Sequence, residues 1–223
     1  MPPLVFNGVT IPDNSANALS FNGSNVTQVV FNGTTVWQQS LGPSYDLGLT
    51  PILDTISGQN NLGWLQRTVD VSGYAGATVR PVFRYLNGNG FRGDIQLDQI
   101  VIGGTTSSFE SSADSYQRSN TGSNTATYSS VPWEAVSTTG GANGEWQRDS
   151  AGTPTTGTGR TDAAAGSFYL FAETSGTAVS NNAYFWLRGP AVTLDSSNPV
   201  FTYYEARVGS NIGTLNVYLD VIS

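Results

Sequence analysis

The sequence predicts an all-β protein built as a β-sandwich or jelly roll, and three observations support that prediction. Charged residues make up only 11% of the 223 residues, against roughly 25% in ordinary soluble domains. Gly (26) and Pro (10), with many Asn and Asp, interrupt nearly every window before three helical turns could form. The runs between these turn residues are short and rich in aliphatic, β-branched and aromatic side chains, as in strands.

In chain order, the runs with the length and composition of strands are Asn25–Val30, Thr34–Gln39, Leu65–Val71, Thr78–Leu86, Ile95–Ile102, Ser167–Glu173, Ala183–Leu187, Val200–Val208 and Thr214–Val221. Their number suits a sandwich or jelly roll. Two intervening stretches, Ser111–Thr127 and Gly140–Gly166, are rich in Ser, Thr, Gly and Asn. We expect long surface loops there, which either only connect strands or also contact a ligand.

Residues 1–43 carry a short internal repeat in which an aromatic residue precedes Asn-Gly. It occurs at Phe6, Phe21 and Phe31, and Trp37 follows the last copy. Asn-Gly suits the two positive-φ positions of a type I′ turn, so the repeat predicts successive tight hairpins. Isolated hairpins are marginally stable and cannot bury these aromatics. We therefore expect residues 1–43 to bind another surface through Phe6, Phe21, Phe31 and Trp37.

The composition excludes several classes of chemistry. The chain contains no His and no Cys, which removes Ser-His-Asp and Cys-His nucleophile systems, disulfides and zinc sites with nitrogen or sulfur ligands. The basic residues are nine scattered Arg in a chain of net charge −7, so no basic patch favours nucleic acid or an anionic membrane. The start MPPLVFNGVT lacks the pattern of a secretory signal, and no run is long enough to span a membrane as a helix.

The last repeat, VVFNGTTVWQQS, resembles a short hairpin found near the ends of bacteriophage tail and other virion proteins. In that hairpin an Asn-Gly turn is followed by a β-branched residue and Trp. The resemblance implies that the segment anchors the chain in a larger assembly. The alternative is a hairpin that packs Trp37 on the neighbouring domain.

From Phe109 onward the aromatic, Gly and Pro spacing resembles a MAM domain, a β-sandwich adhesion module of cell-surface proteins. The residues that carry this resemblance are Phe109-Glu110, Trp146, Gly152–Thr155, Gly159–Asp162, Gly166–Leu170, Glu173–Ser175, Ala183, Leu187–Pro190, Phe201–Tyr204, Gly209 and Ile212–Leu219. The family's paired cysteines are missing. The sandwich must therefore be held by packing and backbone ladders, as suits a compartment where disulfides do not form.

The closing third of the same family pattern lies upstream of its beginning. Asn61–Val71, Val79–Leu86 and Gly88–Ile100 resemble the family's Trp-x-x-x-x-Val-x-Leu strand and its Gly-Phe-x-Gly-Asp-Ile-Ala-Leu-Asp-Asp-Ile end. Segments 44–103 and 109–223 should therefore share one core. One chain could close the sandwich in circularly permuted order through the link Gly103–Ser108, neighbouring subunits could exchange segments, or the chain could be a fragment of a longer array.

The MAM resemblance also implies a structural cation site, since acidic residues lie near both joins. The expected oxygen ligands for Ca²⁺ or Na⁺ are Glu110, Asp114, Asp162 and Asp98, with Asp94 nearby. Solvated carboxylates or Arg pairs are the alternative, and no cofactor is required. Trp133, beside the long loops, is the aromatic residue outside residues 1–43 that we expect to contact a ligand.

These observations favour a bacteriophage virion protein (tail, fibre or capsid surface). Residues 1–43 would bind other virion proteins, and a MAM-like module would serve assembly or contact with a host-surface receptor or glycan. We expect a homo-oligomer, made in the host cytoplasm, without enzymatic activity, nucleic-acid binding or membrane insertion. The competing class is a soluble or secreted adhesion module of cellular origin. A glycan-active enzyme, which needs two facing carboxylates, ranks third.

Overall fold

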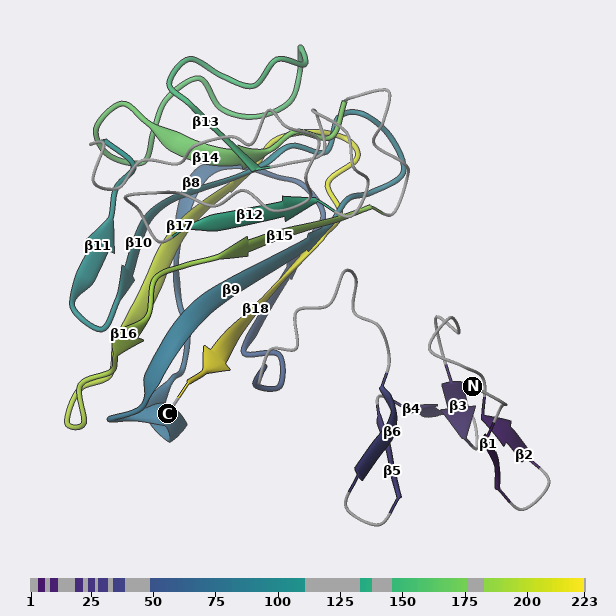
Figure 1. The fold of residues 1–223 in the computed structure, drawn as a ribbon. Coiled ribbons are helices and arrows are strands. Elements are labelled where there is room, and N and C mark those ends of the chain that lie inside the picture. Colours follow the sequence, from purple (N-terminus) through teal and green to yellow (C-terminus); the bar gives the residue numbers. More distant parts are fainter. Residues whose placement is uncertain are drawn as a thin grey trace. The chain divides into compact units, whose positions relative to one another are not determined.

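The computed structural model describes residues 49–110, 133–137, 146–175 and 183–222, together with the backbone of the strands between residues 4 and 38 (Figure 1). The chain divides into two units, residues 1–46 and 47–223. The strands of the first unit are β1 (Leu4–Phe6), β2 (Val9–Ile11), β3 (Leu19–Phe21), β4 (Ser24–Val26), β5 (Gln28–Phe31) and β6 (Thr34–Gln38).

The first unit forms the predicted tight hairpins. Strands β1 and β2, β3 and β4, and β5 and β6 pair antiparallel, and the innermost pairs are Phe6 with Val9, Phe21 with Ser24 and Phe31 with Thr34. Each pair encloses one Asn-Gly dipeptide, which confirms the hairpin prediction. The predicted strand Asn25–Val30 is corrected, because its residues are divided between β4 and β5, which belong to different hairpins.

The second unit consists of two antiparallel six-stranded sheets, as predicted for a β-sandwich. The β10 sheet runs β13 (Trp146–Asp149), β14 (Tyr169–Ala172), β10 (Ile95–Ile102), β17 (Phe201–Arg207) and β8 (Asn60–Thr68), with β11 (Thr105–Ser107) also paired to β10. The β9 sheet runs β12 (Glu134–Ser137), β15 (Tyr184–Arg188), β9 (Thr78–Leu86), β18 (Thr214–Val221) and β7 (Asp54–Ser57), with β16 (Val192–Thr193) also paired to β9. A 3₁₀ turn, Ser72–Tyr74, precedes β9.

Segments 44–103 and 109–223 alternate within both sheets. Strand β17 lies between β10 and β8, and β18 lies between β9 and β7. The two sheets share one apolar core that draws buried residues from both segments, including Phe83, Leu97, Phe185 and Phe201. The predicted common core is therefore confirmed, and it forms within one chain.

The connections at both joins fit this closure. Residue Leu49 pairs with Asp220 near the end of β18, and the Thr50 N–H donates to the Leu219 carbonyl at 2.9 Å. At the other join, Ile102 pairs with Thr105, so that Gly103 and Gly104 turn β10 into β11. Because two glycines adopt the positive φ angles of this turn at little cost, the link between the segments is a hairpin.

The expected loop over Gly140–Gly166 is corrected at its start. Residues Trp146–Asp149 form β13, which pairs with β14 at the edge of the β10 sheet. An edge strand with one apolar anchor, Trp146, has no alternating pattern to detect in the sequence. The short strands β7, β11, β12 and β16 were also not predicted.

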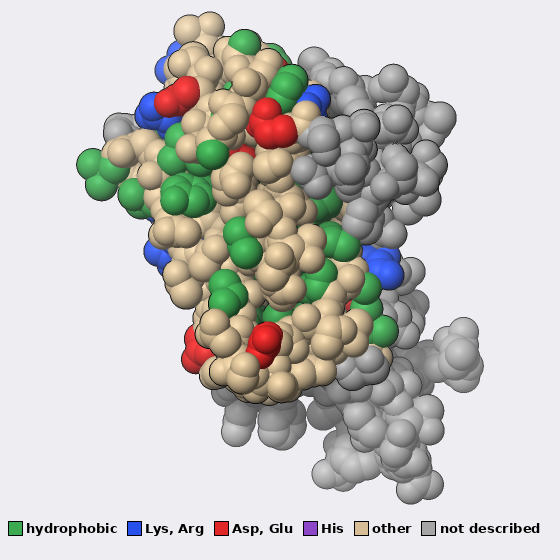
Figure 2. Space-filling view, turned by 90° about the vertical axis from the view of Figure 1, so that its left-hand side faces the viewer, with side chains coloured by type: hydrophobic (Ala, Val, Ile, Leu, Met, Phe, Trp, Pro, Cys, Tyr) green, Lys and Arg blue, Asp and Glu red, His purple; other side chains and the backbone are tan. Residues whose placement is uncertain are grey.

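The surface reflects the low charge of the sequence. Figure 2 shows a side of the molecule on which uncharged polar side chains and backbone dominate, with acidic and basic groups scattered singly. In the part of the chain that the structure describes, no helix has the length and apolar character needed to cross a membrane.

Candidate functional site

Residues 150–166, the covering loop, lie over the outer face of the β10 sheet. Strand β10 alternates between buried apolar residues, Ile95 and Leu97, and polar residues that face outward. The outward residues Asp94, Gln96 and Asp98 are nevertheless fully buried, since each of them contacts the covering loop or the residues next to it. A row of polar side chains on one strand thus fixes a loop that has no regular structure of its own.

The centre of this row binds the middle of the covering loop. Gln96 bonds to both the N–H and the carbonyl of Arg160. The Tyr169 hydroxyl accepts from the Gly152 N–H at 2.7 Å, and the Trp64 indole N–H donates to the Asp162 carbonyl at 3.0 Å. Side chains from β10, β14 and β8 therefore supply the hydrogen bonds that the loop backbone requires.

Asp98 and Glu110 bind the end of the same loop. Asp98 Oδ2 accepts from the N–H groups of Ala164 and Ala165 at 2.9 and 3.2 Å. Glu110 Oε1 accepts from the N–H groups of Ser167 and Phe168. Burial, with a smaller contribution from the nearby Glu110 carboxylate, raises the pKa of Asp98 to about 6 against the effect of these backbone hydrogen bonds. Gly166 lies between the two N–H groups bound by Asp98 and the two bound by Glu110.

Gly166 has φ +71°, and a Cβ there would lie 2.5 Å from the Glu110 carboxyl carbon. Glycine adopts this positive φ without strain, and a side chain here would also displace the Glu110 carboxylate.

Asp94 and Glu173 are buried across from each other, where the β10–β14 register continues beyond the strands. Asp94 Oδ1 accepts from the N–H and the hydroxyl of Thr174, both at 2.9 Å. Oδ2 of Asp94 and Oε2 of Glu173 are buried without a hydrogen-bond partner. Burial, followed by repulsion from Glu173, raises the pKa of Asp94 to about 6. Burial beside a second carboxylate therefore favours the protonated form of Asp94.

The expected cation ligands are only partly brought together. Asp98 and Glu110 lie at one loop, where Oδ2 of Asp98 and Oε1 of Glu110 each accept two backbone N–H groups. Asp162 instead pairs with Arg160 at 2.7 Å, and Asp114 lies outside the described residues. In the described ranges no group of three or more acidic side chains could hold a metal ion. Asp98 and Glu110 therefore bind the backbone of the covering loop, and the expected cation site stays a prediction.

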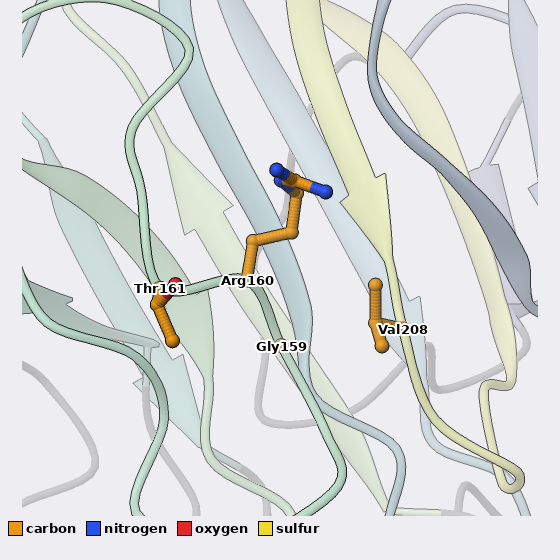
Figure 3. A pocket seen from close by; sticks show the side chains of 4 residues that line it. All are labelled: Gly159, Arg160, Thr161 and Val208. Carbon is orange, nitrogen blue, oxygen red and sulfur yellow. The ribbon is translucent and has the colours of Figure 1, made fainter.

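A shallow cleft of about 380 Å³ lies between the covering loop and the end of β17, lined by Gly159, Arg160, Thr161 and Val208. Figure 3 shows the Arg160 side chain extending between the loop and the strand end that carries Val208. Two nitrogens of this guanidinium bind both oxygens of Asp162, at 2.7 and 2.9 Å. The charge of Arg160 is thus already neutralised by Asp162. The cleft therefore offers a ligand few free hydrogen-bonding groups.

The structure tests the predicted ligand contact for only one of the aromatic residues, Trp133. Trp133 is 1% exposed, packs against Phe83 and Phe109, and donates its indole N–H to the Ser107 hydroxyl at 2.9 Å. The expected ligand contact at Trp133 is therefore corrected: the side chain belongs to the core. The side chains of Phe6, Phe21, Phe31 and Trp37 lie outside the described residues, and their role stays a prediction.

Arg84, which the sequence did not single out, lies on the outer face of the β9 sheet. Its guanidinium carbon is 5.1 Å from the ring centre of Tyr184, 5.6 Å from that of Trp186 and 5.3 Å from that of Tyr218. The alternation in Thr78–Leu86 could have placed Arg84 outward, but only the strand order brings the three rings around it.

We compared the chain with protein-family models, curated proteins and solved structures, and none of the three comparisons finds a match.

Proposed function

We propose that this chain is a structural binding protein of a bacteriophage-type virion, in which residues 1–43 attach to the particle and the sandwich contacts the host surface or neighbouring virion proteins. The observation that carries the proposal is the division into a unit of three Asn-Gly hairpins and a separate sandwich with its own core. Hairpins of three to five residues per strand bury little surface alone, so they gain stability by docking on another chain.

We further propose that the sandwich is a MAM-like module in circularly permuted order. The alternation of segments 44–103 and 109–223 in both sheets supports this proposal, as does the proximity of Leu49 to Asp220. The binding role rests on the composition, since a chain without His or Cys lacks the usual nucleophile and base pairs.

The experiment compares the full chain with the variant Phe31→Ser/Trp37→Ser in the last hairpin. We expect the full chain to form oligomers in light scattering and to co-sediment with virions from a culture that carries its gene. The variant should lose both properties and keep the thermal unfolding transition of the sandwich. Phe91→Ser changes an exposed aromatic of the sandwich and is the matched control. Normal sedimentation of the hairpin variant with particles would contradict the proposal.

A further inference from the structure

The outer face of the β10 sheet stays open on β8 and β17, which run side by side (Figure 1). Outward residues alternate along both strands, and antiparallel partners share a face. Tyr204 lies opposite Asp98 of β10 on one side and opposite Gln66 on the other, and Thr202 lies opposite Thr68. Gln66 and Thr68 are exposed, and Thr202 and Tyr204 are partly exposed. Two neighbouring strands thus present four polar side chains on one open face.

These four side chains are free to bind a ligand. In the part of the chain that the structure describes, the side chains of Gln66, Thr68, Thr202 and Tyr204 make no hydrogen bond. Amide and hydroxyl groups can both donate and accept hydrogen bonds. The open face therefore offers donors and acceptors that a molecule can reach from solvent.

Trp64, the preceding outward residue of β8, adds an aromatic ring to this face. It is only partly buried, whereas the other tryptophans of the sandwich are in the core or nearly fully covered. Its indole N–H donates to the Asp162 carbonyl at 3.0 Å, and its ring centre lies 5.9 Å from that of Tyr169. These two contacts fix the ring in place while part of it remains accessible.

The cleft beside the covering loop continues the same face. Residues 61–64 bulge out of β8 opposite Ala206, and the next outward residue of β17 is Val208, which lines the cleft. A Cβ on Gly63 would lie 3.5 Å from the guanidinium of Arg160, which also lines the cleft. The cleft therefore borders the bulge, and the polar rows of β8 and β17 extend away from it.

The outward rows of β8 and β17 carry no charged side chain. The charged residues of these strands, Arg67, Glu205 and Arg207, alternate with the outward residues and form ion pairs on the other side. In the covering loop, Arg160 and Asp162 are paired with each other. A ligand that is complementary to this face is therefore uncharged, although the chain as a whole has a net charge of −7.

We propose that this face, from the cleft to Thr68 and Thr202, binds a neutral saccharide. Sugar hydroxyls bond to the amide of Gln66 and to the hydroxyls of Tyr204 and the two threonines. The apolar C–H face of one sugar ring packs on the accessible part of Trp64. This inference names a ligand class for the host-contact role proposed above and rests on that proposal.

A protein partner fits the same face less well, because protein interfaces have an apolar centre from which charged groups are depleted. Among the exposed large apolar side chains of the described residues, Leu62 is the member that belongs to β8 or β17, and it lies in the bulge. The rows Gln66–Tyr204 and Thr68–Thr202 contain only polar side chains. Their chemistry suits sugar hydroxyls better than a packed protein surface.

The test titrates the full chain with cellohexaose, a neutral extended oligosaccharide. Hexagalacturonate, which has equal length and one carboxylate per sugar, is the comparison ligand. We expect cellohexaose to bind with an affinity that salt does not change, because no charge takes part. The double variant Gln66→Leu/Tyr204→Phe should lower this affinity about 5- to 100-fold, since two hydrogen bonds are lost. Gln59→Leu, at an exposed position between β7 and β8, should leave the affinity unchanged.

A second measurement on the unaltered chain guards against misfolding of the variant. In NMR spectra, cellohexaose should shift the Trp64 indole N–H and the Gln66 side-chain amide signals and leave the Trp133 indole signal in place. Absence of binding, or equal binding by the double variant, overturns the proposal. Preferential binding of hexagalacturonate overturns the assignment of a neutral ligand. None of these outcomes touches particle attachment, which the hairpin variant tests separately.

Discussion

Gln96 holds Arg160 by both of its backbone groups. The Arg160 N–H donates to Oε1 of Gln96 at 2.6 Å, and Nε2 of Gln96 donates to the Arg160 carbonyl at 3.0 Å. The amide thus imitates the pairing of a neighbouring strand at a loop that is 64 residues away in the sequence. Because Gln96 is fully buried, water could replace neither of these two hydrogen bonds unless the covering loop moved away from β10.

This pairing gives the first prediction. Gln96→Leu leaves the Arg160 N–H without a partner and the Arg160 carbonyl with only the Tyr169 hydroxyl, at 3.2 Å. It should lower the free energy of unfolding by about 1–3 kcal/mol. Gln66→Leu, at an exposed position of β8, should change it by less than about 0.5 kcal/mol. Urea unfolding midpoints measure both. Equal midpoints for the two variants would show that the covering loop contributes nothing to stability.

The second prediction concerns Tyr85, which connects two loops at one end of the sandwich. Its hydroxyl donates to the Gly93 carbonyl and accepts from the Gly213 N–H at 2.9 Å. Tyr85→Phe keeps the ring but leaves two backbone groups unpaired, and should destabilise the fold by about 1–3 kcal/mol. Tyr204→Phe on the outer face of β17 serves as the control. Thermal unfolding should show a clearly lower Tm for the Tyr85 variant only.

The third prediction is a pH dependence carried by Asp94. Its pKa is about 6 in the folded chain, against 3.8 for an ordinary Asp, so the folded state binds its proton more tightly than the unfolded state. The stability from this proton is complete below pH 4 and is lost as the pH rises towards and through 6. Asp94→Asn should therefore flatten the fall in unfolding free energy between pH 4 and 7. An unchanged slope in denaturant titrations across this range would contradict the assignment.

The fourth prediction addresses the cation expected from the MAM resemblance. Asp98 and Glu110 already bind backbone N–H groups of the covering loop. We therefore expect 1 mM CaCl₂ to leave the Tm within about 1 °C of its value in EDTA, at matched ionic strength. In a domain of this size, a shift of about 2–4 °C would correspond to roughly 1 kcal/mol. A Ca²⁺-dependent rise that disappears in Glu110→Gln would instead establish a cation site.

The central strands of the sandwich could be predicted from the sequence, because they are long and bounded by turn residues. The expected bounds of Thr78–Leu86, Ile95–Ile102 and Thr214–Val221 coincide with β9, β10 and β18. The Asn-Gly dipeptides likewise predicted the hairpins, since a two-residue turn is a local property. Edge strands such as β13 escaped prediction, because their pairing partners and not their own pattern make them strands.

The candidate sites depended on contacts that no local pattern contains. The sequence determined that Asp94, Gln96 and Asp98 alternate with apolar residues and so share one face of a strand. Only the tertiary structure decided that this face is covered by residues 150–166, which turns expected cation ligands into acceptors for backbone N–H groups. In the same way, the sequence placed Arg84 on the outward side of β9, whereas the strand order β15-β9-β18 brought three rings around it from residues 100 to 134 positions further along the chain. The physical reason is that alternation fixes which side of a strand a residue faces, while long-range pairing between strands fixes what it meets there.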